Sequence, residues 1–137
     1  MNMSQPALTL SRLDVERLER LLETPAMAAL PVADALQEEM ARADIVTPEA
    51  VPANVVTMNS TVLCREESSG QEHRLTLVYP SEADASSGKV SVLAPVGAAL
   101  LGLSIGQSID WPAPEGMLSL QVLGIPYQPE AAGDWHR

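Results

Sequence analysis

The chain has 137 residues, 46% of them hydrophobic, and a formal net charge of −10 at pH 7. This length and apolar content suit a small folded unit and exclude wholesale disorder. Only 3% of the residues are aromatic and the eight basic residues form no cluster, which disfavours a nucleic-acid-binding surface and favours a protein partner with a basic surface.

The first predicted element is a helix that follows Ser11. Serine is a favoured N-cap, and Asp14 stands three residues later, as the partner does in a capping box. The helix is expected to end near Thr24, because Pro25 disfavours helical geometry in the residue before it. Its apolar residues share one stripe, which consists of Val15, Leu18, Leu21 and Leu22.

A second helix is predicted to begin at Pro31, and Glu38 and Arg42 are spaced to pair on its exposed face. Its apolar stripe consists of Val32, Leu36, Met40 and Ala43. The two helices predict a short antiparallel hairpin, or coiled coil, within residues 1–47. With about three or four turns in each helix, the hairpin needs support from the rest of the chain. Its tip consists of Thr24, Pro25, Ala26, Met27, Ala28, Ala29 and Leu30.

The remainder of the chain has the period of two that is typical of strands. Residues 48–53 are predicted to be a linker, and residues 54–137 a C-terminal domain. The predicted strands cover residues 55–66, 72–80, 89–94, 107–111 and 117–125. A helix is predicted to begin at Pro95. The expected fold class is therefore α+β, with an antiparallel or mixed sheet of about five strands covered by one helix.

The uncharged stretch 90–109 is long enough to suggest a membrane helix, but Pro95 and three glycines interrupt it. Lys89 alone stands at one end and Asp110 at the other, so the basic residues that signal membrane topology are missing. The same stretch resembles a phosphate-binding loop, yet Leu103 stands where that loop needs a lysine. We therefore expect a strand, a helix, a turn and a second strand here, and neither a membrane span nor a nucleotide site.

No catalytic or metal-binding constellation is evident in the sequence. Cys64 lies in an alternating strand and is predicted to be a buried, inert thiol, and His73 is predicted to be a solvent-side strand residue. No histidine, cysteine or carboxylate spacing resembles a metal site, so no cofactor is expected. The N-terminus lacks the features of a signal peptide, and the single cysteine excludes an internal disulfide, so the cytoplasm is the expected location.

Several long stretches resemble one known family. The stretches are PVADAL, VVTMNSTVLCRE, LTLVYP, SVLAPVGAALLGLSIGQSIDW and YQPEAAGD, and together they span nearly the whole chain. They resemble the Rnk family, the bacterial regulators of nucleoside diphosphate kinase, which is similar to the Gre transcript-cleavage factors. The resemblance implies an FKBP-like C-terminal domain, an N-terminal coiled coil, and binding to RNA polymerase near its secondary channel.

The resemblance also implies roles for two segments. In Gre factors a loop around a Ser-Pro pair contacts the polymerase, and the matching partner-binding residues here are Leu93, Ala94, Pro95 and Val96, with Ala94 in the place of the serine. Gre factors carry acidic residues at the tip of a longer hairpin, where they help to hold Mg²⁺ in the polymerase active centre. The tip at residues 24–30 has no carboxylate, so a Gre-like cleavage role is disfavoured.

These features predict a non-enzymatic transcription regulator that binds RNA polymerase and competes with Gre factors. The alternatives are a factor that stimulates transcript cleavage and an FKBP-type prolyl isomerase, which the scarcity of aromatic residues disfavours. The resemblance also implies an effect on nucleoside diphosphate kinase levels, and the sequence leaves open whether this effect is direct or acts through transcription. We expect a monomer with no small-molecule substrate and no membrane association, which meets DNA only through the polymerase.

Overall fold

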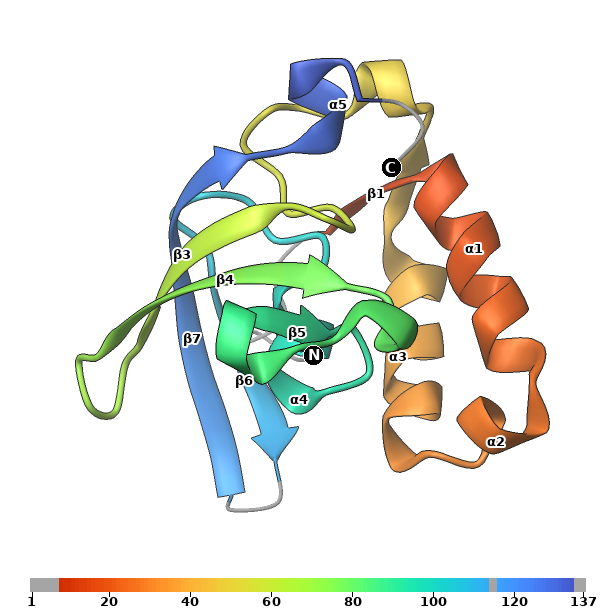
Figure 1. Cartoon of the computed structure of the whole chain (residues 1–137), viewed down its shortest axis with the longest axis horizontal. Coiled ribbons are helices and arrows are strands. Elements are labelled where there is room, and N and C mark those ends of the chain that lie inside the picture. The colour runs from red at the N-terminus through yellow and green to blue at the C-terminus, as the bar shows by residue number, and fades with distance from the viewer. Residues whose placement is uncertain (1–7, 114–115, 135–137) are drawn as a thin grey trace.

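The computed structural model describes residues 8–113 and 116–134. Its helices are α1 (Arg12–Glu23), α2 (Pro25–Ala28), α3 (Pro31–Arg42), α4 (Pro95–Leu100) and α5 (Pro129–Ala132). Its strands are β1 (Thr9–Ser11), β2 (Asp44–Val46), β3 (Thr61–Glu66), β4 (Glu72–Val78), β5 (Lys89–Ser91), β6 (Ser108–Ala113) and β7 (Gly116–Tyr127). Figure 1 shows α1 and α3 on one flank of the molecule and the larger sheet on the other.

The two long helices of the hairpin form where local signals predict them. The Ser11 hydroxyl accepts a hydrogen bond from the Asp14 amide at 3.0 Å, which caps α1, and Pro31 opens α3. The segment between them is not a plain connection, because it contains the one-turn helix α2. The Arg42 guanidinium bonds Glu39 at 2.6 Å, one helical turn away at i−3. The expected pairing of Arg42 with Glu38 stays a prediction.

A short parallel ladder joins the two ends of the hairpin, and the sequence did not predict it. Strand β1 pairs with β2, with Thr9 opposite Asp44 and Ser11 opposite Val46. The amide of Thr9 also donates to the Gly102 carbonyl at 3.2 Å, which attaches the start of the hairpin to the loop after α4. Strands of three residues are too short to show a period, so hydrophobic patterning does not reveal them.

The five-stranded sheet confirms the predicted mixed α+β fold class. The strand order is β5-β4-β3-β7-β6, with antiparallel neighbours except for the parallel pair β4–β5. The uncharged stretch 90–109 divides into the end of β5, helix α4, a turn and the start of β6, as predicted. In the part of the chain that the structure describes, no helix has the length and apolar character needed to cross a bilayer.

The strand predicted over residues 55–66 was wrong in its first half. Strand β3 begins at Thr61, and the preceding residues form a buried turn in which Asn59 has a φ of 68°. The Thr57 amide donates to the Ser60 hydroxyl at 3.0 Å, and the Val56 amide donates to the Leu103 carbonyl at 2.8 Å. The first bond closes the turn locally, and the second ties the segment to the residues after α4, where Val55 also forms an isolated bridge with Ser104. The segment is therefore buried without continuing the ladder of β3.

One hydrophobic cluster holds the hairpin and the sheet together. It includes Leu18 of α1, Leu36 of α3, Leu100 of α4 and Val122 of β7, all 0% exposed. The hairpin thus receives the support that its short helices require.

The division into a hairpin at 1–47, a linker at 48–53 and a C-terminal domain at 54–137 stays a prediction. The first seven and the last three residues of the chain, and residues 114–115, lie outside the described residues. Within the predicted linker, Pro48–Ala50 forms a 3₁₀ turn and Val51 is buried. The remaining 3₁₀ turns of the described chain are Pro80–Glu82 and Ala85–Ser87.

Candidate docking groove and hairpin tip

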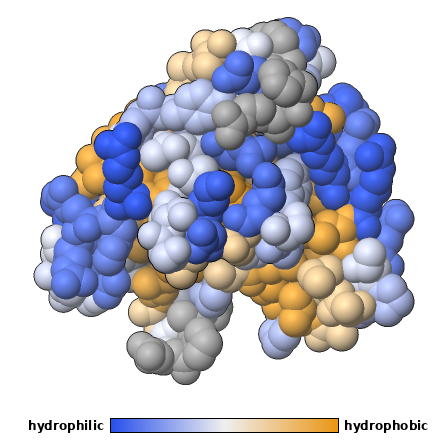
Figure 2. Space-filling view, in the orientation of Figure 1, coloured by the Kyte–Doolittle hydropathy of each residue, from blue (hydrophilic) through white to orange (hydrophobic). Residues whose placement is uncertain are grey.

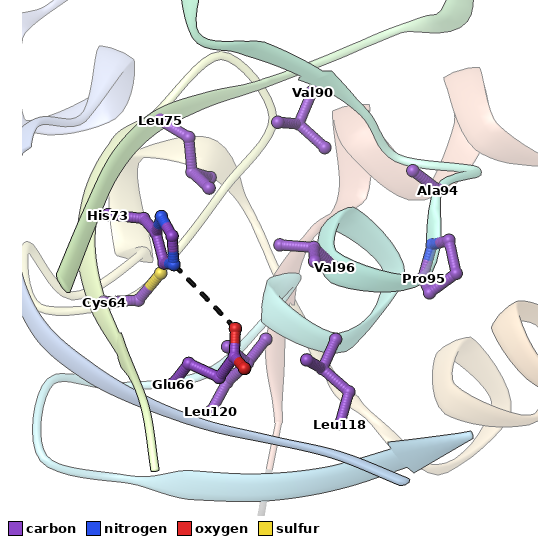
Figure 3. A pocket seen from close by; sticks show the side chains of 10 residues that line it. All are labelled: Cys64, Glu66, His73, Leu75, Val90, Ala94, Pro95, Val96, Leu118 and Leu120. Carbon is purple, nitrogen blue, oxygen red and sulfur yellow. Dashed lines mark ion pairs between the residues drawn. The ribbon is translucent and has the colours of Figure 1, made fainter. Parts of the chain in front are cut away.

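An apolar groove of about 420 Å³ lies between one face of the larger sheet and the start of α4 (Figure 3). We call it the docking groove. It is lined by Cys64, Glu66, His73, Leu75, Val90, Ala94, Pro95, Val96, Leu118 and Leu120. All of these residues except Glu66 and His73 have apolar or weakly polar side chains, so the groove is suited to an apolar segment of a partner.

Strand register brings the sheet side of the groove together. Cys64 of β3 stands directly opposite His73 of β4 in the antiparallel ladder, and Leu75 follows two residues later on the same face. Leu118 and Leu120 reach the groove from β7, which pairs with the other edge of β3. Residues that are far apart in the sequence therefore share one concave surface.

Helix α4 forms the opposite wall and lies unusually close to β5. Ala94 is its N-cap and Pro95 its first residue, so the missing proline N–H costs no hydrogen bond. A Cβ atom at Gly97 would stand 2.1 Å from the Ser91 carbonyl oxygen. Only glycine permits this approach, and the approach sets the position of Ala94, Pro95 and the groove wall.

The polar end of the groove contains Cys64, Glu66 and His73. The His73 Nε2 atom lies 3.9 Å from the Glu66 carboxylate, as the dashed line in Figure 3 marks. Burial, together with the Glu66 charge, raises the pKa of the Cys64 thiol to about 11. The thiol is therefore protonated at neutral pH, which supports the prediction of an inert residue.

The structure brings three of the four predicted partner-binding residues into the groove. Ala94, Pro95 and Val96 line it, and Leu93 does not. Leu93 and Val96 both pack against the hydrophobic core. His73 is exposed, as predicted, but it also lines the groove, and the sequence analysis did not include it in a site. The turn between the two predicted strands could have placed His73 opposite Cys64, because the turn of a hairpin determines which residues of its strands stand opposite each other.

The predicted tip is an apolar projection at the end of the hairpin. Most of its residues are exposed, and Leu30 keeps 38% of its surface accessible. Figure 2 shows hydrophobic residues gathered over this end of the hairpin, where Figure 1 places α2. Among the described residues no group of three His, Cys, Asp or Glu side chains is arranged to hold a metal ion.

Comparisons with known proteins match both halves of the chain. Residues 6–46 match the family model "Rnk N-terminus", and residues 51–127 match "Transcription elongation factor, GreA/GreB, C-term". The chain is 52% identical over 134 residues to the regulator of nucleoside diphosphate kinase of Escherichia coli (strain K12), covering 97% of this chain and 98% of that protein.

Other relatives carry the names of elongation factors. A solved structure titled as a prokaryotic transcription elongation factor GreA/GreB from Nitrosomonas europaea superposes with a TM-score of 0.72 and 52% identity, covering 90% of this chain and 100% of that chain. The transcription elongation factor GreA of Flavobacterium johnsoniae is 37% identical over 90 residues, covering 66% of this chain and 57% of that factor. The chain therefore belongs to the Rnk family of regulators, whose C-terminal part is that of the elongation factors GreA and GreB.

Proposed function

We propose that this protein regulates transcription by binding RNA polymerase near the secondary channel, with the docking groove as its principal contact. The observation that carries the proposal is the groove itself. Ala94, Pro95 and Val96, which match the polymerase-contacting loop of Gre factors, line it together with apolar strand residues. A well-packed apolar pocket is the usual place for the anchor side chain of a protein partner.

The tip of the hairpin supports a role in competition rather than in transcript cleavage. Holding Mg²⁺ requires oxygen ligands, and residues 24–30 provide no carboxylate. Helices α1 and α3 have 12 residues each, so the hairpin reaches about 18 Å at 1.5 Å per residue. We propose that the protein occupies the Gre docking surface and thereby excludes Gre factors.

The proposal extends to how the protein is organised and where it acts. A five-stranded sheet with a short helix on one face supports an FKBP-like class for the C-terminal domain, with the boundary at residues 48–53. The protein would act in the cytoplasm as a monomer and meet DNA only through the polymerase. Any effect on nucleoside diphosphate kinase would follow from altered transcription rather than from direct contact.

The docking groove is tested with a matched pair of substitutions. In Ala94→Glu a charged side chain enters the groove at the N-cap of α4, whereas in Ile105→Glu the same side chain is placed at a residue that is 43% exposed and does not line the groove. Binding to purified RNA polymerase is measured by fluorescence anisotropy of the labelled protein. We expect Ala94→Glu to weaken binding by about tenfold or more, equivalent to at least 1.4 kcal/mol.

The control, Ile105→Glu, is expected to have an affinity for RNA polymerase within about twofold of that of the unchanged protein, because surface substitutions outside an interface have small effects. Far-ultraviolet circular dichroism and thermal unfolding verify that both variants are folded. Equal affinity of Ala94→Glu and the unchanged protein would remove the groove from the proposal. An absence of binding by the unchanged protein at micromolar concentration and moderate salt would overturn the proposal as a whole.

A further inference from the structure

A buried carboxyl group joins the helical hairpin to the C-terminal part of the chain. Asp14, in the first turn of α1, is only 2% exposed. Its Oδ2 atom accepts a hydrogen bond from the Met58 amide at 3.1 Å, across 44 residues of sequence. Met58 lies in the buried turn before β3, so this hydrogen bond links the first turn of α1 directly to the turn that leads into the larger sheet.

Titratable groups from three parts of the chain act on Asp14. Glu130 of α5 is close enough for its charge to act on Asp14, and its carboxylate accepts a hydrogen bond from the Thr57 hydroxyl at 2.7 Å. Tyr79, directly after β4, and Arg17, one turn along α1, also interact electrostatically with Asp14. Two carboxyl groups and a phenol thus lie near one guanidinium, with Asp14 buried and the other three residues partly buried.

This environment opposes the ionisation of Asp14. Burial raises its pKa from 3.8 to about 7, while the Met58 amide lowers it and the Glu130 charge raises it further. Burial, and then the Asp14 charge, also raises the pKa of the Tyr79 hydroxyl, against the effect of Arg17. Desolvation disfavours the charged form of an acid, and a like charge nearby acts in the same direction.

We infer that Asp14 is the residue that positions the helical hairpin on the C-terminal part, and that the strength of this attachment depends on whether its carboxyl group carries a proton. The uncharged acid accepts the Met58 hydrogen bond without placing a second charge beside Glu130. The ionised form keeps the hydrogen bond but places a desolvated charge at the junction. The inference concerns the isolated protein and does not rest on polymerase binding.

The direction of the pH dependence follows from linkage. The folded protein holds the Asp14 proton more tightly than the unfolded chain does, so this group contributes its full stabilisation below about pH 4. The contribution falls as the pH rises toward the folded pKa of about 7 and is lost above it. The hairpin is therefore attached more strongly in mild acid than in mild base.

The test uses the full chain and three variants. Asp14→Asn keeps an oxygen that accepts the Met58 hydrogen bond but cannot ionise. Asp34→Asn makes the same change at an exposed aspartate in the first turn of α3 and serves as the control. Glu130→Gln removes the neighbouring charge while keeping Asp14.

The first measurement is the chemical shift of the Met58 amide proton, followed by NMR from about pH 5 to pH 8.5. We expect an inflection near pH 7 in the unchanged protein and in Asp34→Asn, no inflection in Asp14→Asn, and a lower midpoint in Glu130→Gln. A Met58 shift that is flat over this range in the unchanged protein, or that titrates unchanged in Asp14→Asn, would overturn the inference.

The second measurement is urea unfolding at each pH. Relative to Asp14→Asn, the unfolding equilibrium constant of the unchanged protein is expected to rise about ten- to a hundredfold between pH 5 and pH 8, because each pKa unit corresponds to a factor of ten. A ratio that does not change with pH would contradict a proton-dependent attachment. If Asp14→Asn does not fold, the test is the midpoint pH of the Met58 amide titration in Glu130→Gln. A midpoint equal to that of the unchanged protein would overturn the inference.

Discussion

At the scale of single residues, the tightest constraint on the docking groove is the absence of a side chain at Gly97. Its backbone lies against the Ser91 carbonyl, where an added Cβ would stand 2.1 Å from oxygen and 3.1 Å from a methyl carbon of Leu77. Backbone atoms on both sides cannot move independently, so α4 would have to lift from the sheet. The fit of one glycine therefore determines the position of the helix that carries Ala94, Pro95 and Val96.

We expect Gly97→Ala to lower the free energy of unfolding by about 1–3 kcal/mol, the usual cost of overpacking. The matched control is Gly124→Ala in β7, where an added Cβ meets no atom within 4 Å. That control is expected to change stability by less than about 0.5 kcal/mol. Urea unfolding of both variants measures the difference, and equal stabilities would show that α4 adjusts without cost.

Single residues also show where sequence reasoning stops. The sequence predicted Asp14 as a capping-box partner, and the Ser11 cap is indeed present. It did not predict that Asp14 is buried and accepts a hydrogen bond from Met58, because that contact depends on how α1 packs against a turn 44 residues away. Local patterns define caps and faces, whereas the environment of a charged group is a property of the tertiary structure.

At the scale of elements, the hairpin has well-defined helix ends, but neither α2 nor α3 has a side-chain hydrogen bond at its N-cap. Leu30 is the N-cap of α3 and provides no side-chain hydrogen bond to the first turn. The Ala33 amide bonds only to the Leu30 carbonyl, at 3.0 Å. A residue with an acceptor in its side chain would satisfy amides that leucine leaves to solvent.

The tip is therefore tested by comparing Leu30→Asp with Leu30→Ala, which both remove the leucine. The aspartate variant is expected to be more stable than the alanine variant by about 0.5–1 kcal/mol, because aspartate is a good N-cap. Both are expected to keep polymerase affinity within about threefold, since neither side chain is in the docking groove. Thermal unfolding and the anisotropy assay measure these two quantities, and a loss of affinity as large as that of Ala94→Glu would assign docking to the tip.

The boundaries of most elements followed from residues with strong local preferences. Pro25 and Pro31 placed the ends of the helices, and Pro95 placed the start of α4. The segment before Thr61 was mistaken for strand because buried residues in a turn look like a buried strand when only hydrophobicity is read. The three-residue strands β1 and β2 were not predicted, because they are defined by hydrogen bonding to each other and are too short to show an alternation of hydrophobic residues.

At the scale of the whole molecule, the docking groove is a property that no single segment contains. Its walls come from β3, β4, β5, β7 and the start of α4. The family resemblance identified Ala94, Pro95 and Val96, but the contribution of His73 and Leu118 depends on strand register and sheet order. Leu93, next to these residues in the chain, is half-buried and packs against the core without lining the groove.

The central claim is that docking on RNA polymerase through this groove excludes Gre factors. The most direct measurement is the rate of GreA-stimulated transcript cleavage by a backtracked polymerase as this protein is added. We predict that the rate falls with added protein, that the protein alone stimulates no cleavage, and that Ala94→Glu needs at least about ten times more protein for the same inhibition. A cleavage rate that stays constant at saturating protein, or that rises with the protein alone, would contradict the account.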